Sequence, residues 1–140
     1  MAGPSELFRD RLRRALEWSQ GDDLAEQQRK LAFQALRRDD FLRAAIFGLE
    51  SFLTRETVEA GHDPMKFQDR DEIEKRFQQA LREREHPDWK RQAYWLLKNM
   101  RNAMAHGTPP NRQEHQQLLK NVDRLREELE RTLNRLTNPT

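Results

Sequence analysis

The residues best suited to chemistry in this sequence are Arg101, Asn102 and His106, which precede Gly107. A histidine can transfer a proton near neutral pH. A guanidinium can bind a phosphate and stabilise the negative charge that develops on it. An arginine and a histidine beside one phosphodiester therefore suit cleavage of RNA, in which the ribose 2′-hydroxyl attacks the adjacent phosphorus. Such a site needs no metal ion.

The spacing of these residues places them on different sides of one helix. Residues four apart, such as Asn102 and His106, lie about 40° apart around a straight helix, whereas Arg101 and His106 lie roughly 140° apart. Two arrangements would bring Arg101 and His106 to one phosphate: the helix frays near Ala105, or the partner group comes from a second chain. A position in the last helical turn also favours the protonated form of His106 through the helix dipole.

The rest of the sequence offers no comparable catalytic arrangement. It has no cysteine, which excludes a disulfide framework, a zinc ribbon and thiol catalysis. It has no histidine pair four residues apart and no glycine-rich phosphate loop. His62 follows Gly61 in a predicted loop, and we expect His86 and His115 at the surface. We therefore expect neither a metal site nor a cofactor.

The composition indicates one helical domain spanning residues 1–140. Hydrophobic residues make up 35% of the chain, with five glycines and six prolines, and stretches rich in Glu, Gln, Arg, Leu and Ala favour helices. The predicted fold class is all-α, a bundle of five or six helices. We divide it into an N-terminal helix within residues 1–20, a core at 22–107 that carries the candidate site, and a C-terminal helix at 111–137.

Apolar residues recur every three or four positions along most of the chain, as expected for helices with one buried face. Asp39 and Asp40 open a helix or break a longer one, and Gly61 ends it. Pro87 opens another, which Gly107 and the two prolines after it end. The last apolar series forms a seam that packs on the bundle or on a second subunit. Its residues, in a helix from about 112 to 136, are Leu118, Val122, Leu125, Leu129, Leu133 and Leu136.

Charge and hydropathy say less about function. The net charge is only +2, so charge alone does not identify a nucleic-acid-binding protein. The chain has 20 arginines and 6 lysines, and we expect most of the arginines on solvated helix faces, where they alternate with Glu or Asp. No apolar run approaches the roughly 20 residues needed to cross a bilayer, and the first residues do not resemble a signal peptide. We expect a cytoplasmic protein without membrane contact.

Residues 96–107, LLKNMRNAMAHG, resemble the signature of HEPN domains. In that family the motif is Arg-x4–6-His, often with a polar residue after the arginine, and Arg101, Asn102 and His106 match these positions. The resemblance implies a metal-independent endoribonuclease that cleaves single-stranded RNA. It implies that Arg101 stabilises phosphate charge, that His106 transfers protons or contacts phosphate, and that Asn102 positions the site.

The same resemblance implies a homodimer in which two motifs face each other across a two-fold axis and form one composite site. Arg101 of one chain then reaches the phosphate beside His106 of the other. Glu50 lies at the flank of the apolar stripe of its helix, and a half-buried acid favours a cationic partner. Glu50 either orients Arg101 or is an ordinary peripheral glutamate.

Residues 41–50, FLRAAIFGLE, are similar to the helix that precedes the motif in the CARF–HEPN ancillary ribonucleases of type III CRISPR systems. The resemblance covers roughly residues 28–107. In that family a CARF sensor domain binds cyclic oligoadenylate and activates the nuclease; 140 residues leave no room for it. The chain is then an isolated effector domain or a free-standing HEPN protein. A toxin of a toxin–antitoxin pair and a non-catalytic dimerisation or scaffold module are the alternatives, and Thr108 stands where many HEPN toxins have tyrosine.

Overall fold

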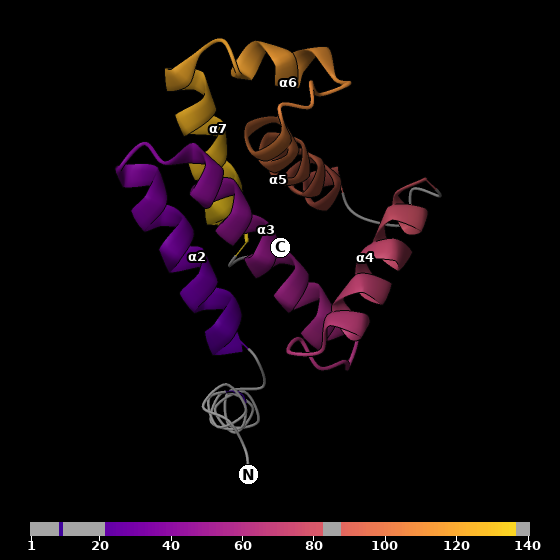
Figure 1. Cartoon of the computed structure of the whole chain (residues 1–140). Coiled ribbons are helices and arrows are strands. Elements are labelled where there is room, and N and C mark those ends of the chain that lie inside the picture. Colours follow the sequence, from indigo (N-terminus) through magenta and orange to yellow (C-terminus); the bar gives the residue numbers. More distant parts are fainter. Residues whose placement is uncertain (1–8, 10–21, 83–87, 137–140) are drawn as a thin grey trace.

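The computed structural model describes residue 9, residues 22–82 and residues 88–136. Within these residues the chain forms six α-helices and no strand, which confirms the predicted all-α class (Figure 1). The helices are α2 (Asp22–Arg37), α3 (Phe41–Glu59), α4 (Phe67–Arg82), α5 (Asp88–His106), α6 (Gln113–Leu118) and α7 (Val122–Arg135). None of these helices is long and apolar enough to cross a membrane. The helix predicted within residues 1–20 and the helix start predicted at Pro87 lie outside the described residues.

Helix α3 begins and ends where the sequence predicts. Asp40 is its N-cap, and the Asp40 carboxylate accepts a hydrogen bond from the backbone amide three residues on, at 3.1 Å. At the other end Gly61 has a left-handed φ of 79°. The Gly61 amide donates to the Val58 carbonyl at 2.9 Å and the His62 amide donates to the Thr57 carbonyl at 3.0 Å. This pair of bonds is the Schellman motif, which ends a helix at a glycine.

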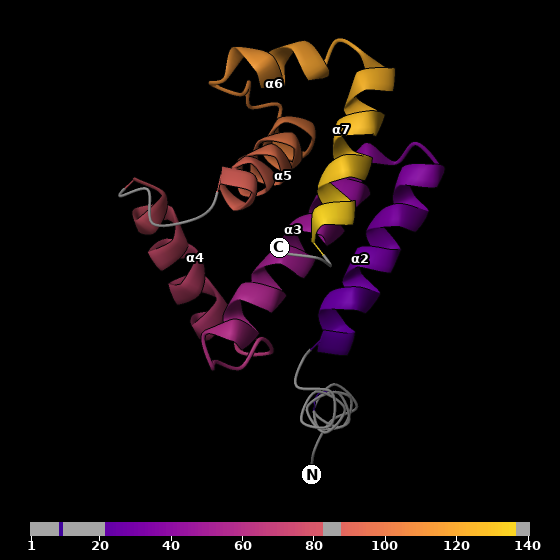
Figure 2. The same cartoon turned by 180° about the vertical axis from the view of Figure 1, so that it is seen from behind.

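Helices α2 and α3 lie side by side as a hairpin in both views (Figures 1 and 2). Both helices bury alanines, whose small side chains allow the two helices to approach closely. Two buried hydroxyls on α3 bond across the contact: Ser51 donates to the Ala25 carbonyl and Thr54 donates to the Gln28 side chain, each at 2.7 Å. Because a buried hydroxyl without a partner is costly, these bonds favour this one register of the hairpin.

Helix α7 packs against the α2–α3 hairpin and buries most of the predicted leucine seam within the same chain. Leu125, Leu129 and Leu133 are buried there. Arg29 of α2 donates through Nε to the Leu133 carbonyl at 2.7 Å. This carbonyl, in the last turn of α7, also accepts from the Leu136 amide at 3.3 Å. The sequence left open whether the seam packs on the bundle or on a second subunit, and in the structure it packs on the bundle.

The single helix predicted over residues 112–136 is wrong, because residues 119–121 form a turn between α6 and α7. Asn121 caps α7 by accepting a hydrogen bond from the Arg124 backbone amide at 3.2 Å. An asparagine competes with the helical hydrogen-bond pattern through its side chain, so it favours a new helix start over continuation. The turn leaves Leu119 and Val122 exposed, by 38% and 53%. Val122 is therefore not part of the buried seam.

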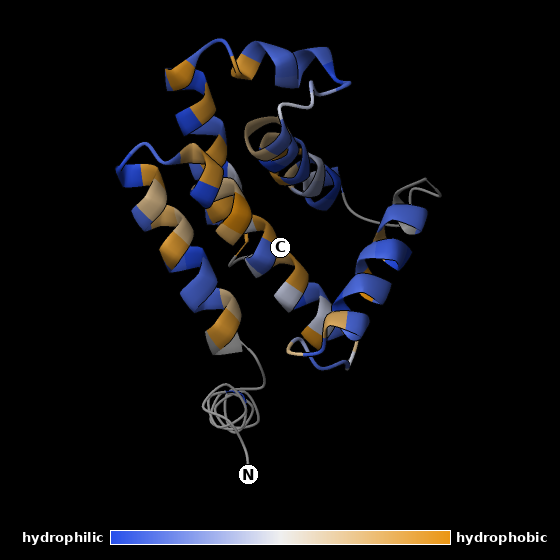
Figure 3. Cartoon of the chain, viewed as in Figure 1, coloured by the Kyte–Doolittle hydropathy of each residue, from blue (hydrophilic) through white to orange (hydrophobic). Residues whose placement is uncertain are grey.

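Helices α3, α4 and α5 meet at three aromatic rings. Phe52, Phe77 and Tyr94 are buried, one from each helix, with ring centroids 5.1 to 5.9 Å apart. Their edge-on and tilted geometry adds to the free energy gained by burying the rings. The rest of α4 is mostly hydrophilic (Figure 3), so its attachment to the bundle depends on a few apolar side chains.

We expect Leu129→Ala to lower the free energy of unfolding by about 2–5 kcal/mol, because the side chain is fully buried and its truncation leaves a cavity. Leu119→Ala removes the same atoms from an exposed position, and we expect it to cost about 0.5 kcal/mol or less. Urea denaturation at several protein concentrations measures both values. Equal losses for the two variants would contradict the placement of the seam inside one chain.

Candidate active site

Helix α5 continues without a break through the whole motif to His106. The Gly107 amide still donates to the Ala103 carbonyl four residues earlier, at 2.9 Å. Gly107 then takes a left-handed φ of 67° and ends the helix. Of the two arrangements that would bring Arg101 to His106, fraying near Ala105 is therefore not observed.

Arg101 and Asn102 are joined by hydrogen bonds at the surface of α5. The Asn102 side-chain oxygen accepts from Arg101 Nη2 at 3.0 Å and from Arg101 Nε at 3.4 Å. Around the helix Asn102 lies between the other two residues, about 100° from Arg101 and about 40° from His106. The bond therefore draws the guanidinium around the helix toward the side that carries His106. Both Arg101 and Asn102 are half-buried, which limits the freedom of the pair.

The Cα of Arg101 lies on the side of α5 that faces α4. Seven residues earlier, and thus about 20° away around the helix, the buried Tyr94 hydroxyl donates to Glu74 at 3.2 Å and accepts from Gln78 at 2.6 Å. Burial and the Glu74 charge raise the pKa of Tyr94, and the positive charge of Arg101 acts in the opposite direction. Lys98 reaches Glu74 at 3.3 Å. Arg101 therefore extends from a polar contact between two helices.

His106 is the last residue of α5 and is exposed to solvent. No hydrogen bond or ion pair joins its side chain to any residue in the described part of the chain. It lies eighteen residues, or five complete turns, beyond Asp88, and so on the same side of α5 as Asp88. The imidazole is thus open to a ligand, on a different side of the helix from the root of Arg101.

Glu50, expected either to orient Arg101 or to be peripheral, forms its ion pair with Arg70 of α4. Both side chains are partly exposed, and the pair links α3 to α4. The Nε of Arg70 is buried and has no hydrogen-bond partner, so the carboxylate of Glu50 is the acceptor that this guanidinium depends on. The structure therefore joins Arg101 to Asn102 and Glu50 to Arg70.

The expectation that His115 lies at the surface is wrong. Its side chain is buried, 6% exposed, on the inner side of α6. His115 Nδ1 lies 3.0 Å from Asn99 Nδ2 of α5, and this contact joins the two helices. Burial, followed by the nearby charge of Arg112, lowers the pKa of His115, so it is neutral at neutral pH. Its spacing of three residues from the buried Leu118 was the signal in the sequence for this placement.

Of the two remaining histidines, the structure describes only His62. His62 is half-buried with Nδ1 3.8 Å from Asp69, and His86 lies outside the described residues. In the ranges that the structure describes, no three histidine or acidic side chains form a group that could hold a metal ion. Comparison of the chain with protein-family models, with curated proteins and with solved structures finds no match.

The lowered pKa of His115 makes stability depend on pH. An unfolded histidine has a pKa of about 6.5, so near pH 6 the unfolded chain binds more protons at this position than the folded chain. Stability from this group is fully present above about pH 6.5 and is lost as the pH falls toward the lowered folded value, by at most about 1.4 kcal/mol per pH unit. Denaturation curves between pH 5.5 and 7.5 measure this slope.

We expect His115→Gln to flatten that slope, since glutamine does not titrate and can still bond to Asn99. His62→Gln is the matched control and leaves the slope in place. A slope that disappears in the control and persists in His115→Gln would show that another histidine carries the effect.

Proposed function

We propose that the chain is a HEPN-type endoribonuclease that cleaves single-stranded RNA without a metal ion, at a site shared by two copies of the chain. The observation that carries this proposal is the end of α5. There Asn102 binds the half-buried guanidinium of Arg101, and His106 stands free in the last turn before Gly107. Arg101 and His106 have the spacing of the HEPN motif, and Asn102 matches the polar residue that often follows its arginine.

In the proposed reaction the ribose 2′-oxygen attacks the adjacent phosphorus while His106 takes the proton of the 2′-hydroxyl. The bond from phosphorus to the 5′-oxygen breaks, and His106 returns the proton to that leaving oxygen. The products are a 2′,3′-cyclic phosphate and a 5′-hydroxyl. Arg101 binds the non-bridging oxygens and stabilises the charge of the five-coordinate phosphorus. Asn102 holds the guanidinium in place for this contact.

The unbroken course of α5 supports the proposal of a site shared by two chains. Within one chain the roots of Arg101 and His106 diverge by roughly 140°, and only Asn102 reduces this separation. In a two-fold dimer in which the two α5 ends face each other, Arg101 can meet the partner subunit's His106 at one phosphate. In this proposal Glu50 has an indirect role. Its ion pair with Arg70 holds α3 to α4, and Arg101 lies on the side of α5 that faces α4.

The resemblance of residues 41–50 and of the motif to CARF–HEPN proteins supports a role as the effector of a CRISPR-associated ancillary nuclease in antiviral defence. A CARF sensor responding to cyclic oligoadenylate would then be a partner supplied outside these 140 residues. Thr108, in place of the tyrosine of many HEPN toxins, makes the toxin the second candidate.

We expect the purified protein to cleave a labelled single-stranded RNA in the presence of EDTA. His106→Ala should lower the rate by about 10²–10⁴-fold through loss of proton transfer, and Arg101→Ala by about 10²–10³-fold through loss of charge stabilisation. Gel analysis of the products measures the rate, and cyclic phosphate ends identify the chemistry.

Arg38→Ala and His62→Ala are the matched controls, because they remove the same residue types away from the α5 end and should retain the wild-type rate. RNA that stays intact at high concentrations of folded wild-type protein would overturn the enzyme and favour a dimerisation or scaffold module. Cleavage that persists in both Arg101→Ala and His106→Ala would assign the activity elsewhere.

The shared site predicts recovery when two inactive variants are mixed. After unfolding and refolding together, half of the dimers of Arg101→Ala and His106→Ala chains are mixed, and each retains one of its two Arg–His pairings. We expect about a quarter of the wild-type rate. Each variant refolded alone gives the baseline rate. A mixture no more active than its components would show that Arg101 and His106 act within the same chain.

A further inference from the structure

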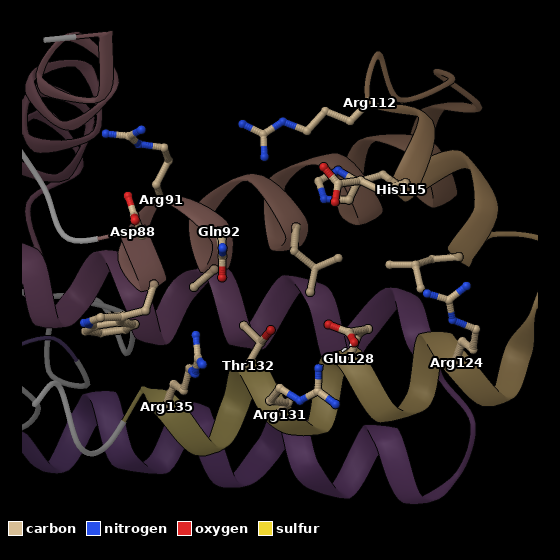
Figure 4. Close-up of a pocket in the computed structure, with 15 residues that line it drawn as sticks. Asp88, Arg91, Gln92, Arg112, His115, Arg124, Glu128, Arg131, Thr132 and Arg135 are labelled. Atoms are coloured by element: carbon tan, nitrogen blue, oxygen red, sulfur yellow. Dashed lines mark hydrogen bonds and ion pairs between the residues drawn. The ribbon is translucent and has the colours of Figure 1, made fainter. Parts of the chain in front are cut away.

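A groove of about 500 Å³ runs between α5, α6 and α7 (Figure 4). Arg91 of α5 and Arg112, the residue that caps α6, stand on one wall. Arg124, Arg131 and Arg135 of α7 stand on the other wall. The sequence predicts most of the arginines on solvated helix faces, and the fold gathers these five around one space.

The charges of the groove do not cancel. Its lining contains five arginines and three carboxylates, and His115 within it is neutral because its pKa is lowered. Arg131 is paired with Glu128 at 2.8 Å. The other four arginines form no ion pair with any described residue, and Arg91 Nε is buried without a hydrogen-bond partner. Guanidinium groups are therefore available to an anionic ligand.

The arrangement of the arginines on α7 suits a polymer better than a single small anion. Arg124, Arg131 and Arg135 are separated by seven and four residues, which places them within about 40° of one another around the helix. They extend over about 16 Å along its axis. A row of this length can bind successive phosphates of one strand, which is how positively charged grooves follow a nucleic-acid backbone.

The groove and the proposed active site share a helix. Asp88 lines one end of the groove, and His106 lies on the same side of α5, five turns further along. Between them Asn99 bonds to His115, which also lines the groove. A strand held in the groove is therefore bound on the side of α5 that carries His106.

We propose that this groove binds the sugar–phosphate backbone of single-stranded RNA and holds the substrate for the site at the end of α5. The proposal deepens the nuclease function above and rests on it for the identity of the polymer. Each bound arginine releases counterions from the RNA, so binding weakens as the salt concentration rises.

The test compares two triple variants in a His106→Ala background, in which binding is measured without cleavage. Arg124, Arg131 and Arg135 are changed to Gln in the groove variant. Arg37, Arg38 and Arg76, which are exposed outside the groove, are changed to Gln in the control. Both variants lose three positive charges, so only the position of the charges differs. Denaturation curves verify that both remain folded.

Fluorescence anisotropy with a labelled single-stranded RNA of mixed sequence, over 50–200 mM salt, measures the affinity. We expect the groove variant to bind at least about tenfold more weakly at the low end of that range, with a logarithmic salt slope less steep by about 2. We expect the control to retain the affinity and slope of the parent. A polyglutamate chain of equal charge should compete poorly with the RNA.

Equal affinity and slope for the groove and control variants would overturn the proposal. So would stronger binding of polyglutamate than of RNA, which would assign the groove to an acidic protein. Binding to RNA that depends on the groove, together with intact RNA in the wild-type cleavage assay, supports the groove and overturns the nuclease. The groove substitutions are also made with His106 intact. If that variant cleaves RNA with an unchanged KM, the groove proposal is overturned and the nuclease proposal stands.

Discussion

The unbroken course of α5 fixes the directions in which its side chains point. A helix advances about 100° per residue, so a single helix presents its residues to several neighbours at once. Tyr94 and Arg101 lie toward α4, Leu97 and Met100 lie in the core, and His106 lies on a third side. Because the core anchors α5 along its length, none of these side chains can change sides without unpacking the bundle.

The same constraint explains why neighbouring polar residues matter at the proposed site. The hydrogen bonds between Arg101 and Asn102 draw the guanidinium around the helix without distorting the backbone. They also leave other guanidinium donors free for a phosphate, because an arginine has five and these contacts use two. A second copy of the chain would complete the geometry through symmetry.

Most polar groups buried between helices are paired within the chain. Ser51, Thr54 and Tyr94 each form a hydrogen bond across a helix contact, and His115 faces Asn99. In the groove between α5, α6 and α7, four arginines without an ion-pair partner among the described residues lie around one space. Positive charges gathered around one concave space raise the local electrostatic potential, so this surface can attract an anion.

The sequence by itself determined the helical class, the ends of α3 at Asp40 and Gly61 and the end of α5 at Gly107, because local backbone chemistry governs where helices start and stop. It also placed Arg101, Asn102 and His106 on one helix. It did not show the break at Asn121, since the leucine spacing continues across it. Only the tertiary structure decided that the leucine seam packs within the chain, that Glu50 meets Arg70, that His115 is buried, and that distant arginines surround one groove. Those results depend on how helices far apart in the sequence pack together, and apolar periodicity carries no information about that.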